Sequence, residues 1–302
     1  AKGRAVRVRV LGSAAGGGLP QWNCGGPNSQ RARAGDPDVP PRSQPAIAVG
    51  SGGGRWSVVN ASPDVREQWT RFPGLHPRPG TREVPVDCIA LTNADLDHVL
   101  GLLVLREALP YRVVTTNWIA RALLDHNAAF RLLEAAFQTV EMGAPFALDR
   151  GKELEAQFFP LPGKVPTWLS GLCEDSPEAT LGLRITDRRT GRRLVYAPGL
   201  SKLDAAVLAE LSQAEVRFVD GTFWSDGELL ELRPDAPNAR RMGHLPIGGA
   251  EGSLAALREL PGRSFYIHIN NTNPILDARS PEAAAVREAG IEIAMDGMEI
   301  AL

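Results

Sequence analysis

Alternation of apolar and polar residues near the start of the chain predicts a half-buried strand over residues 4–11, where Val6, Val8 and Val10 alternate with arginines. Similar alternation or short apolar runs predict strands at 45–50, 55–60, 86–91, 112–115, 154–160, 179–186, 193–197, 215–219 and 264–270. Apolar residues at helical spacing predict helices at 98–109, 117–138, 202–213, 248–259 and 281–289. Strands thus come in runs with helices interleaved in both halves. This order favours a four-layer αββα sandwich, of the α/β (α+β) class, over one parallel sheet.

Two further segments carry local signals. Residues 23–45 are rich in Gly, Pro, Asn and Arg and predict a long irregular loop, which in a compact domain is often functional. Ser62 and Pro63 predict the N-cap and the first position of a helix after the strand at 55–60. Because no linker-like segment divides the chain, we expect a single domain over residues 1–302.

Composition excludes several classes of protein. The net charge is −2 with no basic excess, so we expect no nucleic-acid partner. No run of 18 apolar residues occurs, so we expect no membrane span. The three cysteines, Cys24, Cys88 and Cys173, form no CxxC pair and no even framework, which indicates a reducing compartment and a cytoplasmic location. The size of the chain favours a homodimer.

Three of the five histidines lie where functional side chains concentrate. His98, His244 and His268 each follow a predicted strand or lie in a glycine-flanked loop. His76 lies in a proline-rich loop and His126 on a predicted helix, which indicates structural or surface roles for both. Candidate chemistry is therefore expected around the first three.

The loop TNADLDH (92–98) places four candidate ligands within six residues: Asn93, Asp95, Asp97 and His98. Taken alone, Asp97 could equally be the N-cap of the following helix. Carboxylates this close repel one another unless a cation or a proton lies between them. The cluster therefore indicates a metal site.

Two later segments bring comparable residues to strand ends. Asp220 ends an apolar strand in VRFVDGTFW, although Asp-Gly is also a common turn. His268 lies on the apolar strand of FYIHINNTNP, where a lone histidine is usually a core residue. The polar side chains of Asn270, Asn271 and Asn273 beyond it indicate a pocket at the strand end instead.

Taken in order, the segments ADLDH, YAPGL, FVDGTFW, GHLPIGG and IHINNTNP resemble the family of pyrroloquinoline quinone (PQQ) biosynthesis protein B, within the metallo-β-lactamase superfamily. The segments LGSAAGGGLPQWNC, NASPDVREQW, DHVLGLLVLRE and PGKVP resemble the same family, so the likeness covers essentially the whole chain. The resemblance implies a metallo-β-lactamase-like αββα sandwich and a role in PQQ biosynthesis.

Hydrolases of this superfamily carry HxHxDH at the position of the ADLDH loop. This chain differs from that pattern at the residues that bind the first of their two metals. Asn93 and Asp95 stand at two of its histidine positions, and no histidine occurs between residues 127 and 243 to supply the third. Gly199 stands at the position of the bridging aspartate. The resemblance therefore implies one catalytic metal, and the loss of the two-metal clamp argues against hydrolysis by a bridging hydroxide.

The second metal position keeps Asp97, His98 and His268. Two histidines and one carboxylate form the facial triad of non-haem Fe(II) oxygenases, and catalytic zinc takes three ligands of the same kind. The resemblance implies a single Fe(II), with zinc or manganese as metals retained on purification. The additional candidate ligands are Asp220, Asp95 and Asn93.

Some relatives carry more cysteines after the one at Cys24, spaced to hold a structural zinc. Gly26 and Ser29 occupy those positions in this chain. One cysteine cannot form a closed zinc site. We therefore expect no structural zinc.

The reaction implied by the resemblance is hydroxylation of the tyrosine ring in a cross-linked Glu–Tyr diamino acid from a precursor peptide, with O₂ as co-substrate. His244 and Asp220 match an acid/base pair of phosphodiesterase relatives. The candidate substrate-binding residues are Trp22, Asn270, Asn271 and Asn273. Two alternatives stay open: a mononuclear zinc or manganese hydrolase, and a non-catalytic carrier of finished PQQ.

Overall fold

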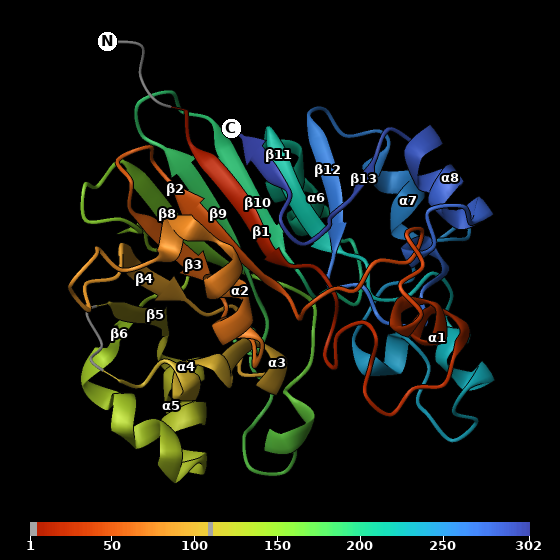
Figure 1. Ribbon diagram of the computed structural model, residues 1–302, viewed down its shortest axis with the longest axis horizontal. Helices are drawn as coiled ribbons and strands as arrows, with labels where there is room; N and C mark the ends of the chain where they lie inside the picture. Colours follow the sequence, from red (N-terminus) through yellow and green to blue (C-terminus); the bar gives the residue numbers. More distant parts are fainter. Residues whose placement is uncertain (1–4, 108–110) are drawn as a thin grey trace.

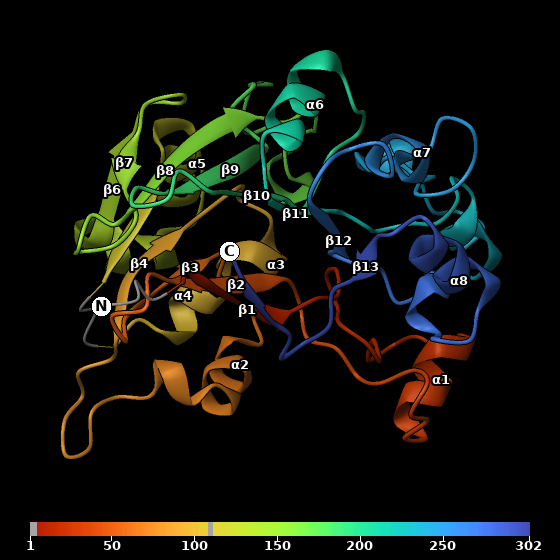
Figure 2. The ribbon, with the colours of Figure 1, turned by 90° about the horizontal axis from the view of Figure 1, so that it is seen from above.

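Two β-sheets face one another and are flanked by helices, which confirms the predicted four-layer sandwich (Figures 1 and 2). The computed structural model describes residues 5–107 and 111–302. Figure 2 shows β8–β10 lying over β1–β4 as separate layers. Each sheet has seven strands within these ranges, and each combines an antiparallel half with a parallel half.

The first sheet has the order β14-β1-β2-β3-β4-β5-β6. Its strands are β1 (Arg7–Gly12), β2 (Ala46–Gly50), β3 (Trp56–Val59), β4 (Val86–Ala90), β5 (Arg112–Thr116), β6 (Phe137–Val140) and β14 (Glu299–Ala301). Pairing is antiparallel from β14 to β3 and parallel from β3 to β6. The loop after β4 therefore lies at the carboxyl edge of the parallel half of this sheet.

The second sheet has the order β13-β12-β11-β10-β9-β8-β7. Its strands are β7 (Phe146–Ala147), β8 (Leu154–Pro160), β9 (Leu181–Asp187), β10 (Arg193–Ala197), β11 (Val216–Asp220), β12 (Arg263–Ile267) and β13 (Glu292–Ile293). Strands β10 to β13 are parallel, and β7 to β10 are antiparallel. The ten strand predictions are confirmed with small shifts at the ends; β6, β7, β13 and β14 were not predicted.

Helices cover the outer faces of the two sheets. They are α1 (Pro27–Arg33), α2 (Val65–Arg71), α3 (Leu96–Val99), α4 (Gly101–Val104), α5 (Asn117–His126), α6 (Ala205–Ser212), α7 (Ser253–Leu257) and α8 (Pro281–Glu288). The 3-10 turns are η1 (Pro73–Leu75), η2 (Ala128–Ala136), η3 (Thr167–Leu169), η4 (Glu228–Glu231), η5 (Arg240–Met242) and η6 (Pro274–Leu276). Figure 1 shows α2 to α5 on the side of the first sheet and α6 to α8 on the side of the second. No helix in the described ranges is long and apolar enough to cross a bilayer.

The predicted helix at 98–109 is wrong in its length, because the segment forms the short helices α3 and α4. At their junction the amide of Gly101 donates to the carbonyl of Ala61 at 2.9 Å, outside the helix. A side chain at position 101 would clash with the carbonyl of Ser62, so the backbone can approach this closely only at glycine. Residues 108 and 109 of that prediction, like residue 4 of the first strand, lie outside the described residues.

Three other predictions need correction. The segment at 117–138 is helical only to His126, after which η2 and then β6 follow. Residues 23–45 contain the helix α1, which begins at Pro27. The helix expected to start at Pro63 begins at Val65, and Ser62 accepts a bond from the amide of Asp64 instead of capping it.

The hydrophobic core lies between the two sheets. Inward side chains of the first sheet, among them Ile47 and Val58, belong to the same fully buried cluster as Phe158, Leu183 and Phe218 of the second. Beyond the core, the amide of Leu181 donates to the carbonyl of Thr92 at 2.8 Å. This bond joins the loop after β4 to the second sheet. The ends of parallel strands from both sheets therefore meet at one edge, where sites of α/β folds commonly form.

Candidate metal centre

The ADLDH loop holds His98 in one orientation. The side-chain oxygen of Asn93 lies 2.6 Å from Nδ1 of His98 and accepts the amide of Asp95 at 3.0 Å. Burial lowers the pKa of His98 to about 4, so the ring is neutral at pH 7. With its proton on Nδ1, the ring presents the lone pair of Nε2, which is buried and has no hydrogen-bond partner among the described residues. A buried nitrogen left in this state fits a metal ligand.

His268 arrives at the same place from the second sheet. Strand β12 ends at Ile267, one residue before it, and His268 adopts a positive φ of 60°. This left-handed conformation is uncommon for residues other than glycine and recurs at functional sites. It ends the predicted strand at 264–270 early. Nδ1 of His268 lies 2.8 Å from the hydroxyl of Thr222, which leaves Nε2 to face Asp97.

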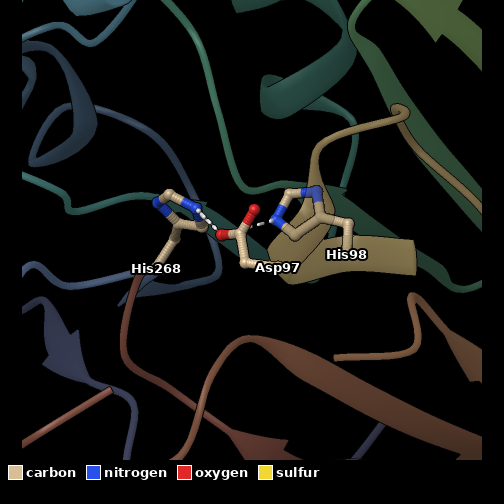
Figure 3. A group of neighbouring side chains, drawn as sticks. All are labelled: Asp97, His98 and His268. Carbon is tan, nitrogen blue, oxygen red and sulfur yellow. Dashed lines mark hydrogen bonds and ion pairs between the residues drawn. The ribbon is translucent and has the colours of Figure 1, made fainter. Parts of the chain in front are cut away.

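Asp97 lies between the two histidines, as Figure 3 shows. Its Oδ2 is 3.2 Å from Nε2 of His268 and 3.8 Å from Nε2 of His98. Ligands bound to one metal at about 2.0–2.2 Å are separated by roughly 3–3.5 Å, so little movement would be needed. All three ligand atoms lie within 4.8 Å of one another. The predicted set of Asp97, His98 and His268 is therefore brought together and fits a metal ion.

The charges of this group match a cation site. Burial acts to raise the pKa of Asp97, but His98 and the hydrogen bond with His268 outweigh it and hold that pKa well below its usual range. Burial likewise acts to lower the pKa of His268, and the bond with Asp97 together with nearby carboxylates raises it. The carboxylate of Asp97 is therefore ionised and accepts a hydrogen bond from Nε2 of His268. A bound metal would replace the proton on that nitrogen.

Asp220 and His244 form a hydrogen-bonded pair beside the three ligands. One oxygen of Asp220 accepts Nδ1 of His244 at 2.7 Å and the amide of Leu200 at 3.0 Å. The other accepts the amide and hydroxyl of Thr222 at 2.9 and 2.5 Å. These bonds place Asp220 to orient His244. Asp220, His244 and His268 also offer ligand atoms within 4.8 Å of one another, so Asp220 stays a candidate ligand. The ring of His244 stacks on that of His268, with centroids 5.4 Å apart, and its Nε2 is left for the pocket.

The other candidate ligands have different surroundings. Asn93 uses its oxygen to hold His98 and Asp95, so its contribution is to orientation. Asp95 lines the pocket, and burial together with the charge of Asp97 raises its pKa to about 6. Asp95 is thus the one additional candidate whose carboxylate accepts no hydrogen bond from the described residues.

The predicted substrate-binding residues are not brought to the centre. Trp22 is 86% exposed and does not line the pocket. Asn273 is fully buried, donates to the carbonyl of Gly221 and caps η6. Asn271 is buried beside Ser29, and Asn270 bonds to the hydroxyl of Thr272. These asparagines shape the turn after His268 and do not line the pocket.

A pocket of about 760 Å³ opens above the three ligands. Its floor carries the side chains of the metal centre, and Gly199 adds open space there, since its missing Cβ would lie 4.0 Å from the ring of His244. The walls include Trp168, Lys164 and Arg233, which the sequence did not single out. His76 and His126 are exposed and lie away from this site, which confirms their expected surface roles.

Comparisons with known proteins show the family of this chain. The family model described as the beta-lactamase superfamily domain matches residues 55–269. Coenzyme PQQ synthesis protein B of Ruegeria pomeroyi is 43% identical over 303 residues, which cover 98% of this chain and 100% of that protein. The chain belongs to the PqqB family. The PqqB-family protein of Azotobacter vinelandii is 40% identical over 302 residues, covering 98% and 100% of the two chains.

Among solved structures, the Zn²⁺-bound PqqB of Methylobacterium extorquens has a TM-score of 0.91 at 39% identity, covering 98% of this chain and 100% of that one. The family resemblance drawn from the sequence motifs is thereby confirmed. In this member of the PqqB family, Asn93 accepts a hydrogen bond from Nδ1 of His98 and so orients that ring.

Substitution of Asn93 tests this orienting role. Asn93→Ala removes the acceptor for Nδ1 of His98, so the ring can rotate and change tautomer. We expect metal affinity to fall about 10–100-fold, as is typical when a partner of a metal ligand is removed. Metal titration of the variant measures this. Asn127→Ala, which removes a similar amide-accepting asparagine at η2, is the matched control. Unchanged affinity in Asn93→Ala would contradict the assignment.

Metal binding should depend on pH through His268. The pKa of His268 is raised above its ordinary value of about 6.5. Below that raised pKa, a metal must displace the proton, so we expect apparent affinity to weaken as pH falls and binding to release up to one proton. Calorimetry in buffers of different ionisation enthalpy measures the release. Affinity that does not change between about pH 6 and 8 would show that His268 is not a ligand.

Proposed function

We propose that this chain is an Fe(II)- and O₂-dependent oxygenase of PQQ biosynthesis. It would hydroxylate the tyrosine ring of a cross-linked Glu–Tyr diamino acid derived from a precursor peptide. The family membership supports the pathway, since its curated relatives are named for PQQ synthesis. The observation that carries the reaction class is the convergence of Asp97, His98 and His268 at the floor of an open pocket.

The three side chains would hold the metal. Two histidines and one carboxylate with open positions favour Fe(II) among first-row metals. When bound, Fe(II) would supply the redox chemistry that activates O₂. Hydrolysis is less well supported, because Gly199 provides no bridging carboxylate and Asn93 is engaged with His98. Zinc, which is bound in the Methylobacterium extorquens protein, fits the same kinds of ligand but supplies no redox chemistry.

Asp220 and His244 would handle protons. Although burial acts to raise it, His244 and other neighbours lower the pKa of Asp220, so its carboxylate is ionised. It accepts Nδ1–H of His244 and so leaves Nε2 of that ring with a free lone pair. We assign to this nitrogen the removal of the phenolic proton of the substrate, since the ring lines the pocket beside His268.

The proposal also includes the expected cellular location, the expected homodimer and the expected absence of a structural zinc. A cytoplasmic location suits the three free cysteines, which would stay reduced there. A homodimer and the absence of a structural zinc stay predictions. Neither is needed for the chemistry assigned to the pocket.

Product analysis tests the function. The protein, loaded anaerobically with Fe(II), would be mixed with the cross-linked diamino acid, ascorbate as the electron donor and isotope-labelled O₂. The proposal expects one labelled oxygen atom on the tyrosine ring, with the second oxygen reduced to water by two electrons from ascorbate. Unlabelled product, or turnover that persists with zinc in place of iron, would favour the hydrolase. Tight binding of finished PQQ without turnover under any metal would favour the carrier.

A further inference from the structure

Two cations line the metal-centre pocket from loops that are far apart in the sequence. Lys164 follows β8, and Arg233 follows η4. Their side chains form no ion pair and no hydrogen bond with any residue in the described ranges. Arg184 and Arg263, by contrast, pair with Glu210 and Glu292. A concave surface with unpaired positive charges attracts anionic ligands.

The position of Lys164 is supported by its packing. Gly243 has a positive φ of 90°, and a Cβ added there would lie 3.3 Å from Cγ of Lys164. The lysine stem thus lies across the glycine, with its ammonium group at the pocket wall. Lys164 lines the same pocket as the side chains of the floor, so its charge acts on a ligand bound there.

Acidic and basic side chains lie in different parts of the pocket. Asp95 and Asp97 lie on the floor with the three histidines, and both cations belong to exposed segments of the wall. A ligand with carboxylates would be attracted to the wall by Lys164 and Arg233. A neutral ring at its other end could enter toward His244 and His268. The pocket thus distinguishes the two ends of such a ligand.

We propose that Lys164 and Arg233 bind the carboxylates of the substrate and so turn its ring toward the metal centre. This inference rests on the proposed function for the identity of the ligand, and it replaces the asparagines after His268 as candidate substrate-binding residues. Arginine can pair with a carboxylate through two parallel hydrogen bonds, and lysine acts as a point charge. Both residues would act on affinity and orientation and take no part in proton transfer.

Binding to the Zn²⁺-loaded protein tests the inference without requiring turnover. The probes are the cross-linked Glu–Tyr diamino acid and its analogue with every carboxylate converted to an amide. Lys164→Gln and Arg233→Gln should each weaken binding of the acid roughly 5–20-fold and leave binding of the amide unchanged. Added salt should weaken acid binding to the parent protein more than to the double variant. Lys202→Gln and Arg258→Gln, exposed residues outside the pocket, are the matched controls.

The outcomes separate this inference from the function on which it rests. If the acid binds the parent protein no better than the amide, or if both variants bind the acid normally, the assignment of Lys164 and Arg233 is wrong. If acid binding depends on them but no oxygen is consumed with Fe(II), the assignment stands and the oxygenase fails. If oxygen is consumed and both variants keep the parent KM, the oxygenase stands and the assignment fails.

Discussion

His98→Ala and His268→Ala should each lose tight metal binding and all Fe(II)-dependent turnover. Each change removes one of three ligands from an open site, and even the partners of ligands contribute 10–100-fold to affinity in known metal sites. We therefore expect affinity to fall by more than about 100-fold. Metal titration followed by elemental analysis measures the first effect, and oxygen uptake measures the second.

The fold should survive both changes, because neither ring belongs to the hydrophobic clusters that hold the sheets together. Thermal unfolding of the metal-free proteins checks this point. His126→Ala is a suitable control, since His126 is an exposed histidine on α5. Full oxygen-dependent turnover in His98→Ala would show that this side chain is no ligand and that the metal centre is assigned wrongly.

His244→Ala should separate proton transfer from metal binding. The ring of His244 touches the centre through Thr222 and the stacked His268, and its Nε2 is left for the pocket. Loss of an acid/base group typically lowers turnover by roughly 10²–10⁴-fold. Metal affinity should fall only modestly, because the three ligands stay in place. The comparison of kcat with metal occupancy in the same preparation measures both.

The metal content of His244→Ala distinguishes a base from a ligand. Thermal unfolding of the same variant separates a loss of stability from a loss of proton transfer. If His244→Ala loses its metal as completely as His268→Ala, then His244 is a ligand and our assignment of it as a base is wrong.

The sequence was sufficient for ten of the fourteen strands in the described ranges, and the family resemblance supplied the three candidate ligands. Alternation of apolar residues marks strands directly, and polar residues that follow an apolar strand must lie at a sheet edge. Asp97, His98 and His268 are of this kind. The interruption at Gly101 could not be predicted, because it depends on the carbonyls of Ala61 and Ser62, which contact it through the tertiary fold.

The pocket wall was predicted poorly. Asn271 and Asn273 follow His268 in the sequence, but the left-handed turn at His268 directs the chain so that both become buried. Asn271 donates to the hydroxyl of Ser29, and Asn273 donates to the carbonyl of Gly221. Lys164 and Arg233 lie in irregular segments whose position over the floor depends on long-range packing. Neither segment has the periodicity that would reveal which side chains face the ligand.

Oxygen consumption by the Fe(II)-loaded protein tests the central claim most directly. The measurement compares Fe(II)-loaded and Zn²⁺-loaded protein with the cross-linked Glu–Tyr diamino acid and ascorbate, and repeats both with His268→Ala. We expect substrate-dependent oxygen uptake only with Fe(II), in proportion to bound iron, and none in His268→Ala. Product formation at equal rates with Zn²⁺ and Fe(II), or without any oxygen uptake, would contradict the assignment of this chain as an oxygenase.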